Sequence, residues 1–299
     1  MGENLEPFEI QREALAERLK LKEQWESQIS ILNETGILQL LPESQELGIV
    51  GIDGEEYPIP DYKEIIDRLT PEKAQILEQK IEQGFSKMLL VPFGMSMETL
   101  AQRYREVVLK KSNEETLLDT DGLRIELDKN NPFPNLISLN TDIDKRLSYY
   151  PSNFEEQEGF TKSEILSRGA GFKIEFIEDR PDLSDNRQAQ GGRFSPPSRS
   201  MPARYLEIIQ NDENMSNEQG WTMETWLTYA ITNLKERNQQ IDSNRWGKFS
   251  WLLGAYFPAQ APSVPIVMYA GWSKGKAELF SGEFDDRSTN ASLRTSVEI

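Results

Sequence analysis

The chain of 299 residues contains neither cysteine nor histidine. The lack of cysteine excludes disulfides, zinc–thiolate sites, iron–sulfur clusters and cysteine nucleophiles. The lack of histidine excludes the Ser-His-Asp triad and removes the commonest general base and most transition-metal sites. An enzyme of this composition would have to use carboxylates, lysine, tyrosine or an oxygen-ligated metal.

Positive charge and long apolar runs are also scarce. The chain has 33 basic and 50 acidic residues, a formal net charge of −17. Phosphate backbones and anionic lipids repel such a chain, so nucleic acid is not expected as a direct partner. No apolar run approaches membrane-spanning length, and the N-terminal residues lack the apolar core of a signal peptide. We therefore expect no membrane insertion and, by default, a cytoplasmic protein.

The first part of the chain carries mostly helix signals. An apolar stripe through 8–34 predicts one long helix, and Thr70, followed by proline, is typical of the start of a second. The continuous apolar run Phe85–Val91 predicts a buried strand, after which Ser96 caps a third helix. These signals predict a mostly helical N-terminal region over 1–112.

The rest of the chain, 113–299, mixes strand and helix signals and is predicted to form the second domain. Its start is polar and loop-like to about residue 147, which marks the boundary. Alternation in 171–180 predicts a half-buried strand, and 182–202 has the composition of a mobile loop. The later elements are expected to be a helix with apolar residues from Met223 to Leu234 and strands at 249–257, 264–272 and 293–299. The predicted fold class is α+β.

Five of the six tryptophans lie between 221 and 272. Buried tryptophan is an ordinary way to fill a core, and we expect Trp226 and Trp251 to be core residues. The segment that begins at Tyr269 differs, because aromatic and small residues alternate with others along it. This composition is typical of binding loops, although an ordinary hairpin with core phenylalanines would show the same pattern.

Two short motifs carry little chemistry. Asp179, Asp182, Asp185 and Asn186 offer oxygen ligands, but they do not match a calcium-binding loop and are interpreted as a solvated acidic loop. The glycines of 48–54 lack a following phosphate-binding helix and predict a turn between short strands. We therefore predict no catalytic residue, no metal site and no cofactor.

The order of C-terminal elements resembles the variable proteins of diversity-generating retroelements. The resemblance covers roughly 120–299 and rests on GWTMETWLTYAITNLKERNQQID, FSWLLGAYF, VPIVMYAGW and the final LRTSVEI. It implies a C-type-lectin-like fold for 113–299 that presents a hypervariable segment at about 265–299. The chain departs from the family in lacking its Gly-Gly-Ser-Trp-like element, and it lacks the tripeptides with which lectins bind sugar through calcium.

The resemblance also implies roles for individual positions. The positions expected to be scaffold are Ala277, Leu279, Arg287, Leu293, Arg294 and Val297. The candidate ligand-binding residues are Tyr269, Gly271, Trp272, Ser273, Gly275, Phe280, Gly282, Phe284 and Asp285. Because side chains alternate along strands, we expect Leu279, Leu293 and Val297 to be buried and the variable positions to share one exposed surface.

The function that follows is ligand binding without catalysis, for an unknown protein or peptide partner. Aromatic anchors suit protein interfaces better than sugar sites. Two alternatives remain open at this point. One is a carboxylate-based enzyme of unknown reaction, and the other is a structural or assembly protein. The oligomeric state does not follow from the sequence.

Overall fold

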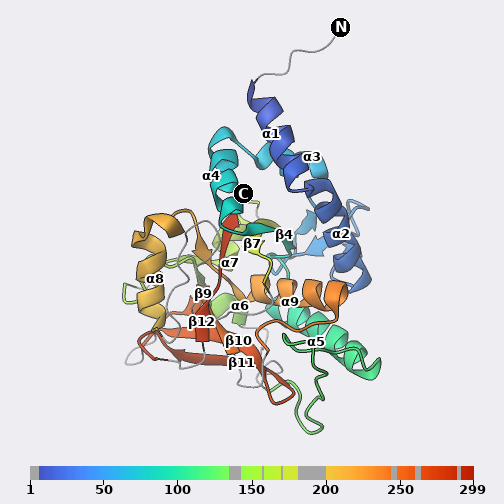
Figure 1. Cartoon of the computed structure of the whole chain (residues 1–299), viewed down its shortest axis with the longest axis vertical. Helices are drawn as coiled ribbons and strands as arrows, with labels where there is room; N and C mark the ends of the chain where they lie inside the picture. The colour runs from blue at the N-terminus through green and yellow to red at the C-terminus, as the bar shows by residue number, and fades with distance from the viewer. Residues whose placement is uncertain are drawn as a thin grey trace.

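A computed structural model describes residues 7–134, 143–156, 158–169, 171–180, 200–243, 248–259, 264–287 and 291–299. The helices are α1 (Pro7–Arg18), α2 (Leu21–Glu34), α3 (Tyr62–Arg68), α4 (Pro71–Glu82), α5 (Met97–Asn113), α6 (Ile143–Arg146), α7 (Lys162–Leu166), α8 (Pro202–Asn211), the short 3₁₀ helix η2 (Glu213–Met215) and α9 (Met223–Arg237). The fold is a mixture of helices and mainly antiparallel sheets, as the predicted α+β class requires (Figure 1).

The strands form four groups. Their bounds are β1 (Gln39–Leu40), β2 (Leu47–Val50), β3 (Glu56–Pro58), β4 (Phe85–Val91), β5 (Ser148–Tyr149), β6 (Phe160–Thr161), β7 (Lys173–Glu178), β8 (Gln219–Gly220), β9 (Lys248–Phe257), β10 (Ile266–Ser273), β11 (Lys276–Glu283), β12 (Ala291–Leu293) and β13 (Thr295–Glu298). The sheet orders are β1-β2-β3, β4-β7-β13-β8, β12-β9-β5-β6 and the hairpin β10-β11.

Several N-terminal elements begin and end where the sequence predicts. Thr70 caps α4, with Pro71 at its first position, and Ser96 caps α5 by accepting a hydrogen bond from the Thr99 amide. Strand β4 has the predicted bounds, and the glycine-rich stretch at 48–54 lies in the β2–β3 hairpin, as expected. Local capping and turn chemistry therefore fixed these elements.

The long helix predicted over 8–34 is wrong, because the chain breaks it between Arg18 and Leu21. Lys20 has a left-handed backbone with φ of 51°. The Gln24 side-chain amide donates to the Leu19 carbonyl at 2.8 Å. The break lets Leu19 and Leu21 both enter the core, at 5% and 0% exposed. Tertiary burial thus outweighs helix continuity here.

Strand β7 is buried on both faces, not on one as its alternation predicts. It lies between β4 and β13, and Lys173 and Glu175 are 4% and 1% exposed. Both have partners inside the fold: Lys173 pairs with Glu298 at 2.8 Å, and one carboxylate oxygen of Glu175 accepts a hydrogen bond from Thr225, while the other is buried without a hydrogen bond. The pattern of polar residues at every second position therefore reflects internal partners and not solvent.

The predicted boundary at residue 112 does not separate two cores. Strand β4, from the predicted N-terminal region, pairs antiparallel with β7, and helix α5 packs against α9 (Figure 1). One continuous cluster of buried side chains runs from Leu15 to Ile299. The chain therefore ends inside a sheet that its early strands help to build.

The strand predicted at 293–299 is divided at Arg294. Before it, β12 runs parallel to β9; after it, β13 pairs antiparallel with β7 and β8. The last residues thus connect two sheets. Among the described residues, no helix combines the length and the apolar character that crossing a membrane requires. Most of the loop predicted at 182–202, with Asp182, Asp185 and Asn186 of the acidic motif, lies outside the described residues.

Candidate binding face on the β10–β11 hairpin

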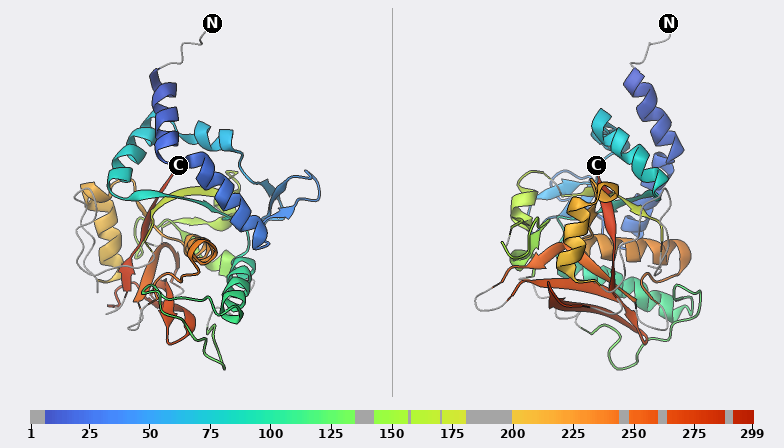
Figure 2. Two further views of the ribbon diagram at one scale, coloured as in Figure 1. Left: turned by 45° about the vertical axis from the view of Figure 1, so that its right-hand side comes forward. Right: turned by 60° about the vertical axis from the view of Figure 1, so that its left-hand side comes forward.

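Strands β10 and β11 form a hairpin at the end of the molecule opposite to α1 (Figures 1 and 2). Lys274 and Gly275 make the two-residue turn, with φ of 50° and 75°. Positive φ at both positions is the geometry of the hairpin turn that matches strand twist. The strands pair without a bulge, so Tyr269 lies opposite Phe280 and Trp272 lies opposite Ala277. The register decides which side chains share a face.

The inner face of the hairpin is part of the core. Its members are Met268, Ala270, Trp272, Ala277 and Leu279, all at most 7% exposed. The indole of Trp272 donates to the Tyr104 hydroxyl at 2.7 Å, which joins the hairpin to α5. This face therefore holds β10 and β11 against the helices.

The outer face carries a half-buried aromatic cluster, consisting of Phe249, Tyr269 and Phe280. The rings of Tyr269 and Phe280 stack with centroids 5.2 Å apart. Phe249, from β9, meets them edge-on at 5.7 and 5.5 Å. We define the outer face as the half-buried hairpin residues of this parity: Tyr269, Ser273, Lys276, Glu278, Phe280 and Gly282.

Trp251 supports the outer face from beneath. It is 1% exposed, as a core residue should be, and its ring centroid lies 4.8 Å from that of Tyr269. A Cβ atom placed on Gly282 would approach the Trp251 ring to 3.1 Å. Glycine at 282 thus lets the strand lie close to the indole, while the rings of Tyr269 and Phe280 stay at the surface.

The structure separates the nine candidate ligand-binding residues into three groups. Half-buried positions are Tyr269, Ser273, Gly275, Phe280, Gly282 and Phe284, and Asp285 is exposed. Gly271 and Trp272 are buried, and their assignment to an accessible surface is wrong. Trp272 has the parity of Met268 and Ala270, which places it inside.

Gly275 and Phe284 have structural contacts that the sequence did not indicate. A Cβ at Gly275 would lie 2.1 Å from the Glu126 carbonyl oxygen, so the turn packs against the preceding loop. Phe284 lies against Phe154, with ring centroids 6.4 Å apart, and borders a second core cluster. Neither residue belongs to the aromatic cluster of the outer face.

The residues expected to be scaffold are buried with one exception. Leu279, Leu293 and Val297 are 4%, 7% and 2% exposed, which confirms the prediction for these three. Ala277 is also buried, and Arg294 is buried in an ion pair with Asp242 at 2.6 Å. Arg287 is exposed.

Carboxylates lie around the outer face. Burial raises the pKa of the Tyr269 hydroxyl, and the negative charges of Glu278 and Asp286 raise it further. Glu283, Asp285 and Asp286 have carboxylate oxygens within 4.8 Å of one another, and all three are exposed. Such a group offers oxygen ligands to a hard cation, but exposed acidic groups are common without one.

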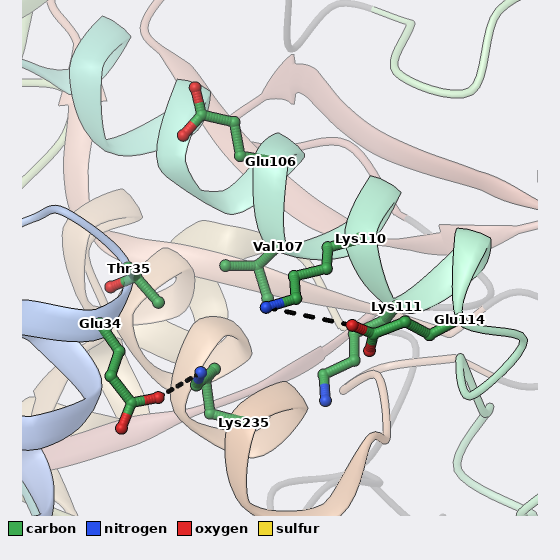
Figure 3. A pocket seen from close by; sticks show the side chains of 8 residues that line it. All are labelled: Glu34, Thr35, Glu106, Val107, Lys110, Lys111, Glu114 and Lys235. Carbon is green, nitrogen blue, oxygen red and sulfur yellow. Dashed lines mark ion pairs between the residues drawn. The ribbon is translucent and has the colours of Figure 1, made fainter.

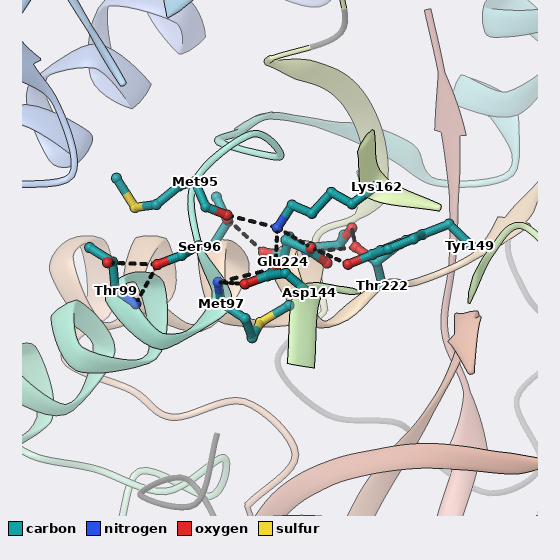
Figure 4. Close-up of polar contacts among 11 residues, drawn as sticks. Met95, Ser96, Met97, Thr99, Asp144, Tyr149, Lys162, Thr222 and Glu224 are labelled. Atoms are coloured by element: carbon teal, nitrogen blue, oxygen red, sulfur yellow. Dashed lines mark hydrogen bonds and ion pairs between the residues drawn. The ribbon is translucent and has the colours of Figure 1, made fainter. Parts of the chain in front are cut away.

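A buried charge cluster was not predicted. We call it the Lys162 cluster; its members are Lys162, Asp144, Glu224 and Tyr149. The Lys162 ammonium donates to Asp144 at 2.7 Å, to Glu224 at 3.0 Å and to the Met95 carbonyl at 2.7 Å (Figure 4). Its side chain is fully buried. No local pattern indicates this cluster, because its bonded pairs are separated by 18 to 75 residues along the chain.

A second buried network surrounds Asp242. Its carboxylate accepts hydrogen bonds from the guanidinium of Arg294, the indole of Trp226 at 3.0 Å and the hydroxyl of Ser250 at 2.6 Å. The Arg294 guanidinium also lies over the Trp221 ring, 4.9 Å from its centroid. This network connects α9, β9 and the end of the chain.

A pocket of about 280 Å³ lies between α2, α5 and α9 (Figure 3). Its charged side chains are Glu34, Glu106, Lys110, Lys111, Glu114 and Lys235. The hydrogen bond from Lys235 lowers the pKa of Glu34, and the hydrogen bond from Gln102 lowers that of Glu106. Carboxyl groups with lowered pKa are poor general acids at neutral pH. The charged groups that line the pocket form ion pairs, Glu34 with Lys235 and Glu114 with Lys110.

Comparison of the chain with known protein families finds no match, and no curated protein and no solved structure matches it. The function of the chain must therefore be inferred from the chemistry of its own site.

Proposed function

We propose that this chain is a non-catalytic ligand-binding protein whose contact surface is the outer face of the β10–β11 hairpin. The observation that carries the proposal is the half-buried aromatic pair on the outer face, where Val267 and Gly271 are themselves buried. Met268, Trp272 and Leu279 fix the inner face in the core, whereas Tyr269 and Phe280 stay half-buried on the other side. Half-exposed aromatics on a rigid support are typical anchors of protein interfaces.

In this proposal the hairpin belongs to a lectin-like domain whose C-terminal segment, about 265–299, is diversified as in retroelement variable proteins. The antiparallel pairing of the last strand, β13, with β7 and β8 supports this proposal, because it anchors the end of the segment in a sheet. The hairpin also supports diversification physically, because substitutions on its half-buried outer face should cost less stability than core substitutions, which cost about 2–5 kcal/mol. The ligand class that follows is a protein or peptide.

The proposal includes the absence of catalysis. The Lys162 cluster holds the acidic and basic groups that an enzyme needs, but Lys162, Asp144 and Glu224 are at most 4% exposed. A substrate cannot reach such groups. The carboxylates of the pocket in Figure 3 are accessible, yet the pKa values of Glu34 and Glu106 are lowered and not raised toward neutrality.

The experiment is to sequence the DNA on both sides of the gene. The proposal predicts a second copy of the stretch that encodes residues 265–299, differing at adenines, beside a reverse transcriptase gene. The differing codons should include those of Tyr269, Ser273 and Phe280 and should spare those of Trp272 and Leu279. Absence of the copy would contradict diversification, and differences spread equally over both faces would contradict the assigned surface.

A further inference from the structure

Acidic groups lie on both sides of the aromatic cluster. Glu278 shares the outer face with Phe280, two residues away on β11. At the other side, Asp286 turns back toward the strand: its carboxylate accepts a hydrogen bond from the Glu283 amide at 3.1 Å. The same carboxylate oxygen lies 3.6 Å from where a Cβ of Gly282 would be. The rings are thus bordered by two carboxylates.

The nearby cations offset part of this charge: burial raises the pKa of Glu278, and the positive charges of Lys276 and Lys274 oppose that shift. Lys274 lies in the exposed turn, at the far end of the hairpin from Asp286. Lys276 is directed to Asp128, with 3.6 Å between the ammonium and carboxylate. Burial raises the pKa of the Tyr269 hydroxyl, and the charges of Glu278 and Asp286 act in the same direction. Arg287 follows Asp286 and is exposed.

We propose that the outer face binds an arginine side chain of a peptide or protein partner, with the guanidinium against Tyr269 and Phe280 and bonded to Glu278 or Asp286. A guanidinium is planar, stacks on aromatic faces and donates to carboxylates in a fork that an ammonium lacks. The interior of this chain contains the same combination, since Arg294 lies over Trp221 and binds Asp242. The inference rests on the proposed function and names its ligand class.

The experiment is an NMR titration of the full-length ¹⁵N-labelled protein with three acetylated, amidated hexapeptides. They have the sequence Ser-X-Gly-X-Ser-Gly, in which X is arginine, lysine or citrulline. Citrulline has the size of arginine but no charge. We expect amide shifts centred on residues 276–286, tightest binding for arginine, weaker binding for lysine and weakest for citrulline. Equal affinity for the arginine and citrulline peptides would overturn the inference.

Three variants distinguish a specific site from attraction to an acidic chain. Phe280→Ser leaves the charge unchanged and should weaken the arginine peptide about 2- to 30-fold, the range of a cation–π contact. Asp286→Asn should also weaken it, whereas Glu23→Gln, an equal charge change on exposed α2, should have a smaller effect. An equal loss in Asp286→Asn and Glu23→Gln, with none in Phe280→Ser, would overturn the inference.

The result also separates this inference from the proposed function. If codon differences fall on the outer face but the arginine peptide shows no preference over citrulline, the ligand class is wrong and the binding face stands. If no second DNA copy exists but the arginine peptide binds the outer face as expected, the ligand class stands and diversification fails.

Discussion

The outer face of the β10–β11 hairpin and the Lys162 cluster differ in burial: the first is half-exposed to solvent and the second is fully buried. On the outer face, Tyr269 and Phe280 are neighbours across two adjacent strands and remain half-buried. In the cluster, Lys162 and Glu224 come from distant helices and are fully buried. Side chains on the outer face can be substituted at little cost to the core. In the Lys162 cluster, by contrast, removing any one charged group leaves the others buried without their partner. We therefore propose ligand contact as the role of the outer face and stabilisation of the fold as the role of the Lys162 cluster.

Removing the cation of the Lys162 cluster should have the largest effect. Lys162→Met leaves Asp144 and Glu224 buried without their partner, and breaking a buried ion pair in this way costs about 3–5 kcal/mol. Urea unfolding measures the loss. The matched control is Lys22→Met, at an exposed position of α2, which should change stability by less than about 0.5 kcal/mol. Equal effects in the two variants would mean that the cluster does not stabilise the fold.

The two hairpin faces should differ when neighbouring residues are shortened. Leu279→Ala creates a cavity in the core and should cost about 2–5 kcal/mol. Phe280→Ser loses the contacts with Tyr269 and Phe249, each worth about 0.5–1.5 kcal/mol for an aromatic pair, but it opens no cavity in the core. This loss exceeds the near-neutral cost of an ordinary exposed site, because the rings support one another. Thermal melts decide the order; an equal cost would make Phe280 a core residue.

Glu175 should give the buried interior a pH dependence close to neutrality. Burial raises its pKa to about 7, the charge of Glu298 contributes in the same direction, and Lys173 partly opposes both. The folded state therefore holds a proton between about pH 4.5 and 7 that the unfolded chain releases, so this group's contribution to stability falls as pH rises through that window.

Glu175→Gln tests this sign. The amide cannot ionise but can still accept the hydrogen bond from Thr225. The variant should match the wild type near pH 4.5 and be more stable at pH 8, by up to about 3 kcal/mol. Urea unfolding from pH 4.5 to 8 measures the difference. Parallel stability curves for the two proteins would show that Glu175 has an ordinary pKa.

The parts of the fold that local signals determine could be predicted. Capping at Thr70 and Ser96, the β4 bounds and the burial of Trp226 and Trp251 all follow from neighbours in sequence. The break at Lys20 could not, because it depends on burying Leu19 and Leu21 together. Nor could the shared sheet of β4, β7 and β13, since strand pairing across such separations leaves no local trace.

The sequence predicts which residues of one strand share a face of the hairpin, but not which residues from other parts of the chain pack beside them. Alternation correctly sends Tyr269 and Phe280 to one side and Leu279 to the other, and it would also have placed Trp272 inside and Glu278 outside. Phe249 was missed because it comes from another strand, and Asp286 because it reaches the face through a turn. The alternation of residues along a strand therefore identifies the residues of one face, but not the residues from other segments that pack against that face.

Randomising each face of the hairpin and counting the variants that fold tests most directly whether the outer face tolerates substitution and the inner face does not. One yeast-displayed library varies Tyr269, Ser273, Glu278 and Phe280, and a matched library varies Met268, Ala270, Trp272 and Leu279. The measurement is the fraction of clones that resist protease as the wild type does. We predict that most outer-face clones resist the protease and that few inner-face clones do. Equal survival in the two libraries would contradict it.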